Sequence, residues 1–441
     1  MMFCNEREGD AMANTHNIDV NYKNKKRYNT AKYPIRQPRF FTWLIWVLSK
    51  ILLIGRKYKV EKINMEGLKP PYMVLSNHMY FVDFELAALA TYPHRVNNVV
   101  ALDGFYRRPW LMELIGCIAT RKFTMDLHLV KSIYKVLERG DVLCMYPEAR
   151  YSPCGISSYI PDSIGALVKR AGVPIVAIVH RGNHLQSPFW NFRKPRKVPL
   201  HTTAEQILTA EDIQRMSPEE IIARIREALT YDEYKYQKEN GILITEPHRA
   251  EGLHKVLYQC PHCLAESRMS SSGSEIFCTE CGKRWNLEED GSLKAMSGET
   301  EFERVPDWFL WQRGQVEEQI ERGEYFFEDE VEVYSQPRAW RFKKLGVGKL
   351  VHDSEHGFTL TGNYNGADYY INRTPVQTNS LHVEYDWCYL KPLDCVDIST
   401  ENDSFFCYPK NKTDVLTKLA FATEILYEKH IVRTHTVKTN Q

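Results

Sequence analysis

The chain has 441 residues, of which 43% are hydrophobic and 26% are charged, and its formal net charge is +1. This length is typical of two or three domains, and the composition indicates folded cores in a soluble or peripheral protein, which argues against a protein made mostly of membrane spans. Four of the eleven cysteines form a metal-binding pattern, and the others show no disulfide framework. A reducing cytosol is therefore the simpler expectation.

The N-terminal region is strongly basic. Between Asn21 and Lys59 there are eleven Lys and Arg residues and no Asp or Glu. We expect residues 1–38 to form a disordered basic arm, which would suit an anionic membrane surface or a nucleic acid. The alternative is a solvated tail without a partner.

An apolar run, Phe40–Ile54, follows the arm. It is shorter than the roughly 20 apolar residues of a membrane span, and its polar residues Thr42, Ser49 and Lys50 fall on one narrow helical stripe. Its two tryptophans favour a headgroup boundary. We expect residues 39–60 to form a membrane-interface helix, peripheral or monotopic, on the cytoplasmic face of a membrane. The alternative is a helix packed into the core of the domain.

Apolar strands alternate with helices from residue 61 to 245, which predicts an α/β domain with a mostly parallel sheet. The expected strands are 72–76, 97–102, 117–121, 141–146 and 174–179. The expected helices are 84–91, 126–139, 162–171 and 217–229.

Residues that could act in catalysis or binding follow these strands, at the edge where open α/β sheets usually hold their sites. His78 precedes Asp83 by five residues, so a carboxylate could hold the imidazole in one tautomer and leave its other nitrogen as a base. Three further stretches come after later strands: Arg121-Lys122, the run Tyr146–Gly155, and His180-Arg181-Gly182-Asn183.

In this order, the stretches resemble the four blocks of the glycerolipid acyltransferase family, whose best known member is lysophosphatidic acid acyltransferase. The resemblance covers roughly residues 40–230. Asn77-His78 with Asp83 fits the family's N-H-x-x-x-x-D. The third block departs from F-P-E-G-T-R-S-x-x-G, because Ala149, Arg150 and Tyr151 replace the glycine, threonine and arginine. An arginine is thus present as Arg150, one position before the place of the family's arginine.

The resemblance implies an enzyme of phospholipid synthesis that moves a fatty acyl group from acyl-CoA or acyl-acyl carrier protein to the hydroxyl of a lysophospholipid of the 1-acyl-glycerol-3-phosphate type. His78 would be the general base and Asp83 would orient it. Glycerol-3-phosphate or another lyso-lipid is an alternative acceptor. The residues that would shape the acceptor site are Asn77, Arg121, Lys122, Glu148, Arg150, Ser152 and Gly155.

Each of these residues also has a structural interpretation. His78 could be a hydrogen-bonded core histidine, Glu148 and Arg150 could pair with each other, and Arg121-Lys122 could be a solvated strand end.

Two C-x-x-C pairs, Cys260/Cys263 and Cys278/Cys281, are separated by fourteen residues. This spacing predicts a structural zinc site within a zinc ribbon spanning residues 246–292. A redox C-x-x-C would need a thioredoxin-like βαβ setting, which is missing. The segment from Cys260 to Trp285 balances three basic against three acidic side chains, so we expect no nucleic-acid binding. A non-catalytic scaffold or nucleic-acid-binding protein remains the competing hypothesis.

Residues 293–441 are predicted to form a β-rich domain. A helix is expected near 308–322, and the last helix is expected at 413–429. The layout of about seven short strands closed by one helix resembles a pleckstrin-homology-like domain. The expected strands are 331–334, 340–342, 357–361, 368–371, 381–385, 395–398 and 404–408.

Overall fold

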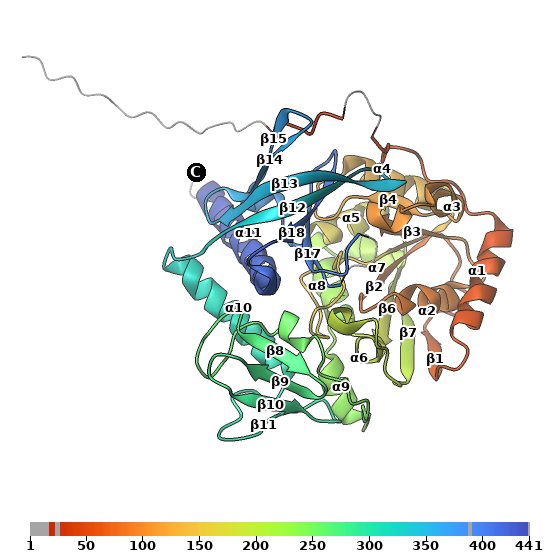
Figure 1. Ribbon diagram of the computed structural model, residues 1–441. Helices are drawn as coiled ribbons and strands as arrows, with labels where there is room; N and C mark the ends of the chain where they lie inside the picture. The colour runs from red at the N-terminus through yellow and green to blue at the C-terminus, as the bar shows by residue number, and fades with distance from the viewer. Residues whose placement is uncertain (1–16, 23–26, 387–389, 440–441) are drawn as a thin grey trace, which may run out of the picture.

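Three sheets organise the chain (Figure 1). The computed structural model describes residues 17–22, 27–386 and 390–439. The first sheet has the strand order β1-β7-β6-β2-β5-β3-β4, and only its β6–β7 pair is antiparallel. The predicted mostly parallel α/β sheet is therefore confirmed. Its strands are β1 (Tyr58–Ile63), β2 (Tyr72–Ser76), β3 (Val96–Ala101), β4 (Ile118–Thr120), β5 (Val142–Met145), β6 (Ile175–Arg181) and β7 (Leu200–Leu208).

Helices cover both faces of this sheet. The central strands β2, β5 and β6 are buried on both sides, which explains their uninterrupted apolar sequences. One face packs against α4, α5 and α8, and the other packs against α2. The helices of this part are α1 (Arg39–Leu52), α2 (Val82–Thr91), α3 (Pro109–Leu114), α4 (Leu127–Glu138), α5 (Ser163–Ala171), α6 (Asn183–Gln186), α7 (Ala210–Arg215), α8 (Pro218–Leu229) and α9 (Glu233–Glu239).

The parallel strands bring the predicted blocks to one edge. β2, β3, β4, β5 and β6 all run in the same direction. Asn77-His78 follows β2, Arg121-Lys122 follows β4, and Tyr146 follows β5. Gly182-Asn183 follows β6. Carboxyl ends of parallel strands share one edge of a sheet, so these four stretches converge although the chain separates them by more than 100 residues.

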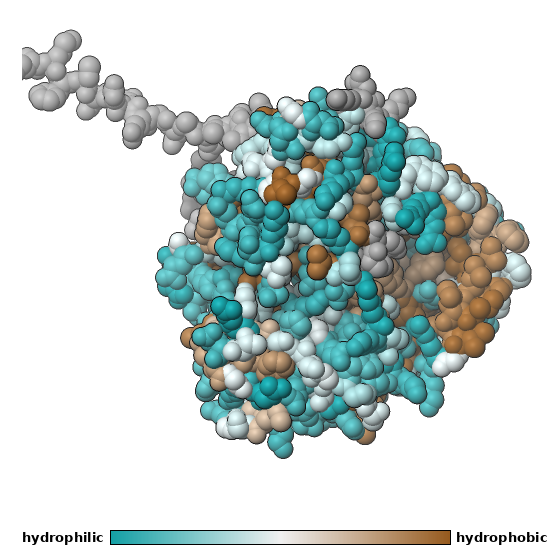
Figure 2. Space-filling view, in the orientation of Figure 1, coloured by the Kyte–Doolittle hydropathy of each residue, from teal (hydrophilic) through white to brown (hydrophobic). Residues whose placement is uncertain are grey.

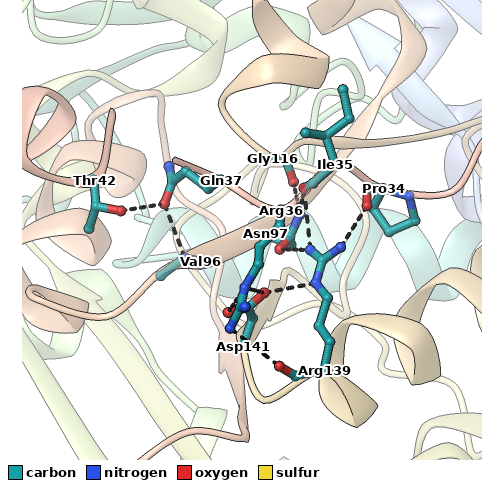
Figure 3. Close-up of polar contacts among 10 residues, drawn as sticks. All are labelled: Pro34, Ile35, Arg36, Gln37, Thr42, Val96, Asn97, Gly116, Arg139 and Asp141. Atoms are coloured by element: carbon teal, nitrogen blue, oxygen red, sulfur yellow. Dashed lines mark hydrogen bonds and ion pairs between the residues drawn. The ribbon is translucent and has the colours of Figure 1, made fainter. Parts of the chain in front are cut away.

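The prediction of a disordered arm over residues 1–38 is wrong for residues 17–22, where Ile18 pairs with Tyr370 of β15, and for residues 27–38; residues 1–16 and 23–26 lie outside the described part of the chain. The Arg36 guanidinium pairs with Asp141 at 3.1 Å, and Arg139 donates to the Pro34 carbonyl at 2.7 Å (Figure 3). Asn97 donates to the Ile35 carbonyl at 3.0 Å. The segment is thus held along the sheet by partners 60 to 105 residues away, and one of them, Asp141, is a buried carboxylate.

A helix, α1, is present where the interface helix was predicted, although it ends at Leu52 and the chain continues as the edge strand β1, and its contact with a membrane stays a prediction. Its Ser49 is buried, and Thr42 donates a hydrogen bond to Gln37 at 2.9 Å, so part of the polar stripe faces the protein. None of the described helices is long and apolar enough to cross a bilayer.

A small antiparallel sheet, in the order β11-β10-β9-β8, follows the α/β part. The third sheet has seven antiparallel strands in the order β15-β14-β13-β12-β18-β17-β16, and the terminal helix α11 follows it. The expected seven strands and last helix are therefore present, whereas the pleckstrin-homology-like resemblance stays a prediction. One continuous apolar core joins the two sheets through Trp285 and Trp308.

The elements of these two parts are β8 (Met269–Ser272), β9 (Glu275–Cys278), β10 (Arg284–Leu287), β11 (Leu293–Ala295), α10 (Val305–Glu321), β12 (Phe326–Arg338), β13 (Arg341–Asp353), β14 (Gly357–Tyr364), β15 (Ala367–Arg373), β16 (His382–Glu384), β17 (Cys395–Ser399), β18 (Ser404–Pro409) and α11 (Leu416–Thr439).

Candidate active site

His78 and Asp83 form a hydrogen-bonded pair between the end of β2 and the first turn of α2. His78 Nδ1 lies 3.0 Å from Asp83 Oδ2, and the Asp83 side chain is fully buried. The backbone N–H groups of Met79 and Tyr80 donate to the same oxygen at 2.6 and 3.0 Å, and Asn183 donates to Oδ1 at 2.6 Å. Asp83 thus accepts four hydrogen bonds when Nδ1 carries its proton, which leaves His78 Nε2 with a free lone pair.

The electrostatic environment favours a charged Asp83 and a neutral His78. Burial disfavours the Asp83 charge, but the His180 and His78 rings and the Asn183 amide outweigh burial and hold the pKa of Asp83 below its usual value. Burial lowers the pKa of His78 below 6.5 despite the Asp83 carboxylate. The imidazole is therefore a free base at neutral pH.

Two tyrosine rings pack on the His78 imidazole. The Tyr146 ring lies 4.0 Å from it between centroids and is nearly parallel, and the Tyr151 ring lies at 4.1 Å. About one fifth of the His78 side chain stays accessible. Tyr146, Tyr151 and Asn183 were not among the predicted site residues, although all three lie in the stretches that resemble the family's blocks.

Asn77 and Ser152 brace the strand ends. The Asn77 side chain donates to the His180 carbonyl at 3.0 Å and accepts the His180 N–H at 2.8 Å, which ties β2 to β6. The Ser152 N–H donates to the His78 carbonyl at 2.9 Å, and its hydroxyl donates to the Ile156 carbonyl. The Asn77 side chain and the Ser152 backbone N–H therefore hold the backbone around His78.

Gly155 has a φ of +76°, and a Cβ on it would lie 2.9 Å from the His184 ring and 3.0 Å from Glu233 Cβ. A side chain is excluded here by close packing within the protein.

Glu148 and Arg150 take separate partners. Glu148 is buried and accepts the Ser158 N–H at 2.8 Å, and burial raises its pKa to about 7. Arg150 pairs at 2.7 Å with Glu424 of α11, which belongs to the C-terminal part of the chain.

Glu148→Gln is expected to stabilise the fold at pH 8 but not at pH 4.5. The unfolded chain ionises Glu148 near its ordinary pKa of 4.5, whereas the folded protein resists ionisation up to about 7. Stability is therefore lost as the pH rises between these values, by at most about 3 kcal/mol. Urea unfolding at both pH values measures the difference. Glu138→Gln, at the exposed end of α4, is the control, and an equal effect of Glu148→Gln at both pH values would contradict the assignment.

Arg121 and Lys122 are both buried against the C-terminal sheet. Arg121 donates to the Ser404 hydroxyl at 3.1 Å and to the Gln336 carbonyl at 3.4 Å. The Lys122 ammonium lies within 3.6 Å of three carboxylates, those of Asp103, Glu384 and Asp397. The two residues are thus not a solvated strand end.

The four cysteines of the ribbon converge as predicted. The sulfur atoms of Cys260, Cys263, Cys278 and Cys281 all lie within 4.8 Å of one another. The Cys260–Cys281 and Cys263–Cys278 sulfurs are 3.8 and 3.7 Å apart. Tetrahedral zinc with bonds of about 2.3 Å separates its sulfur ligands by about 3.8 Å, so the arrangement fits a structural zinc ion.

Comparisons with known proteins add little to this geometry. No protein-family model matches the sequence, and no curated protein matches it. Among solved structures, the chain is similar to the 1-acyl-sn-glycerophosphate (LPA) acyltransferase PlsC from Thermotoga maritima, with 14% identity over 42% of this chain and 78% of that one. The TM-score of 0.34 is too low to establish a shared fold, so function has to be argued from the site.

Proposed function

We propose that the protein is an O-acyltransferase that moves a fatty acyl group from a thioester of coenzyme A or acyl carrier protein to the hydroxyl of a lysophospholipid. The observation that carries the proposal is the His78–Asp83 pair, in which the carboxylate fixes Nδ1 and leaves Nε2 unprotonated, while about one fifth of the side chain is accessible. The acceptor is a 1-acyl-glycerol-3-phosphate, whose phosphate would need the basic residues after β4 and β5.

The transfer needs one base. His78 Nε2 removes the proton from the acceptor hydroxyl as its oxygen attacks the thioester carbonyl. The carbon–sulfur bond then breaks, the proton passes to the leaving sulfur, and the products are an ester and a free thiol. Asp83 stabilises the imidazolium between the two proton transfers. General-base catalysis accounts for about 10²–10⁴-fold, and positioning supplies the remainder.

The pocket between α1, α2 and the sheet holds only about 30 Å³, which is far too little for an acyl chain. Phe84, next to Asp83 in the chain, is one of its walls, and Ile45 of α1 is another.

The competing nucleic-acid hypothesis finds no support in the ribbon. The three Lys and Arg side chains between Cys260 and Trp285, which are Arg268, Lys283 and Arg284, each pair with a glutamate. A nucleic-acid surface would need unpaired positive charge.

Thiol release tests the reaction. Purified zinc-loaded protein and acyl-CoA are mixed with lysophosphatidic acid, and the free thiol is measured with a thiol reagent. We expect release only when the lyso-lipid is present, and none with phosphatidic acid, which lacks the free hydroxyl. Equal release with and without acceptor would identify a thioesterase instead.

The outer face of α1 is the surface that we propose binds an anionic membrane. Its exposed large apolar residues gather where Figure 2 shows a brown patch, on the side occupied by α1 in Figure 1. Exposed basic residues flank them. Apolar contact and attraction to anionic lipid then act together. The apolar residues are Phe40, Trp43, Leu48, Ile51, Leu52 and Ile54.

Trp43→Glu/Ile51→Glu is expected to weaken binding to anionic vesicles by at least about 100-fold, because two apolar contacts of roughly 1.5–3 kcal/mol each are lost. Flotation with phosphatidylserine-containing vesicles measures it. The control, Leu310→Glu/Val347→Glu, adds the same charges at half-exposed apolar sites on α10 and β13. Equal binding by both double variants and the wild type would exclude α1 as the docking surface.

A further inference from the structure

All three basic residues predicted to hold the acceptor phosphate contact the C-terminal part of the chain. Arg121 donates to Ser404 of β18, Lys122 pairs with Glu384 of β16, and Arg150 pairs with Glu424 of α11. These contacts join residues separated by more than 250 positions in the sequence. They place the C-terminal sheet and helix over the ligand groups on which the proposed function depends.

The Lys122 cluster holds more negative than positive side chains. Its ammonium lies 2.8 Å from Asp103, 3.1 Å from Glu384 and 3.6 Å from Asp397. Burial disfavours the Glu384 charge, but His382 and Lys122 outweigh it and hold the pKa of Glu384 at about 2. An acceptor phosphate arriving here would meet a lysine that carboxylates already surround.

Arg150 is likewise paired with a carboxylate of the C-terminal part, that of Glu424. The Arg150 guanidinium lies 2.7 Å from Glu424, and about a tenth of each side chain is accessible. The Ser380 hydroxyl donates to the same carboxylate oxygen at 2.8 Å, which fixes its position. A phosphate would have to replace this carboxylate to bond Arg150.

Aromatic contacts connect these ion pairs to the predicted base. The Tyr151 ring, which packs on His78, lies 4.9 Å from the Phe189 ring between centroids. Phe189 in turn lies 5.7 Å from the His382 ring, and His382 Nε2 donates to Glu384 Oε1 at 2.8 Å. The C-terminal sheet is therefore connected to His78 through Phe189 and Tyr151.

We propose that the structure is a closed state, in which Glu384, Asp397 and Glu424 occupy the cations that the acceptor phosphate requires. The proposal rests on the proposed function, because it assigns these cations to that acceptor. Carboxylate and phosphate oxygens use the same charge-assisted hydrogen bonds, so a phosphate at Lys122 and Arg150 competes with these carboxylates for the N–H donors. Binding of the acceptor then requires the C-terminal sheet and α11 to release the α/β part.

Equilibrium binding of a short-chain, monomeric 1-acyl-glycerol-3-phosphate to full-length, zinc-loaded protein tests this competition. We expect Glu384→Gln/Glu424→Gln to bind at least tenfold more tightly than the wild type in calorimetry. The matched control is Glu428→Gln, one turn further along α11, since Glu428 pairs with Arg313 of α10 and not with the α/β part. Unchanged or weaker binding by the double variant, or no binding by any of these proteins, would overturn the closed state.

Hydrogen exchange on the wild type gives a second readout that does not depend on a variant folding. We expect the same ligand at saturation to speed exchange in β16, β17 and the start of α11, and slower or unchanged exchange would refute opening. Tighter binding by the double variant without any acyl transfer would refute the proposed enzyme while leaving the closure intact. Acyl transfer with unchanged binding would refute only the closure.

Discussion

Cys260→Ser is expected to lose the metal and unfold the region from β8 to β11. Cys260 is fully buried, and its sulfur lies with three others at the spacing of tetrahedral zinc. Structural zinc binds with an apparent free energy of about 10–16 kcal/mol, comparable to or larger than the stability of a typical domain of about 5–15 kcal/mol. The small sheet shares its core with α10 through Trp285 and Trp308, so the loss should spread to that helix.

Metal analysis and thermal unfolding measure this effect. We expect one zinc ion per wild-type chain, none in Cys260→Ser, and an early additional transition in the variant. Cys407→Ala is the control, because Cys407 is a buried cysteine of β18 outside the cluster. It should keep its zinc and lose only a small amount of stability. A purified wild type that is folded without metal would contradict the zinc site.

His78→Ala is expected to lower kcat by about 10²–10⁴-fold, the contribution of a positioned general base. The fold should survive, because the side chain is partly accessible and lies at the end of β2 rather than in its core. Because burial lowers the pKa of His78 below 6.5, the fall of kcat/KM of the wild type on acidification should have its midpoint below pH 6.5.

Steady-state kinetics on both proteins, with circular dichroism as a check on folding, gives the comparison. His128→Ala, which changes an exposed histidine in the first turn of α4, should leave the rate unchanged. A His78→Ala protein within threefold of the wild type would exclude this imidazole as the base.

Much of the α/β part could be predicted because its signals are local. The strands β2, β5 and β6 are uninterrupted apolar runs, since both of their faces are covered. The edge strand β1 was not predicted, because its side chains are mostly exposed and polar, and the strand that it pairs with, β7, comes about 140 residues later. Strands at a sheet edge carry little hydrophobic pattern.

That residues 27–38 are ordered could not be predicted, for a related reason. A run of basic residues without acids is typical of a solvated tail, and nothing local indicates otherwise. Their partners, such as Asp141 for Arg36 and Glu113 for Lys32, come from distant elements of the fold.

The candidate site also contains residues that local spacing predicts and residues that only distant packing brings together. The His78–Asp83 pair and the four cysteines were predictable, because short spacings within a strand end or a turn already place them together. The partners of Lys122 and Arg150 were not, because Glu384 and Glu424 lie more than 250 residues away and only the packing of two sheets brings them in.

Acyl transfer itself is most directly tested by following the acyl group. Wild-type, zinc-loaded protein is incubated with radiolabelled acyl-CoA and vesicles that contain lysophosphatidic acid, and the labelled lipids are separated and identified. We expect the label in the ester of phosphatidic acid. Label that stays on coenzyme A, or appears only as free fatty acid, would contradict the central claim that the protein esterifies a lipid hydroxyl.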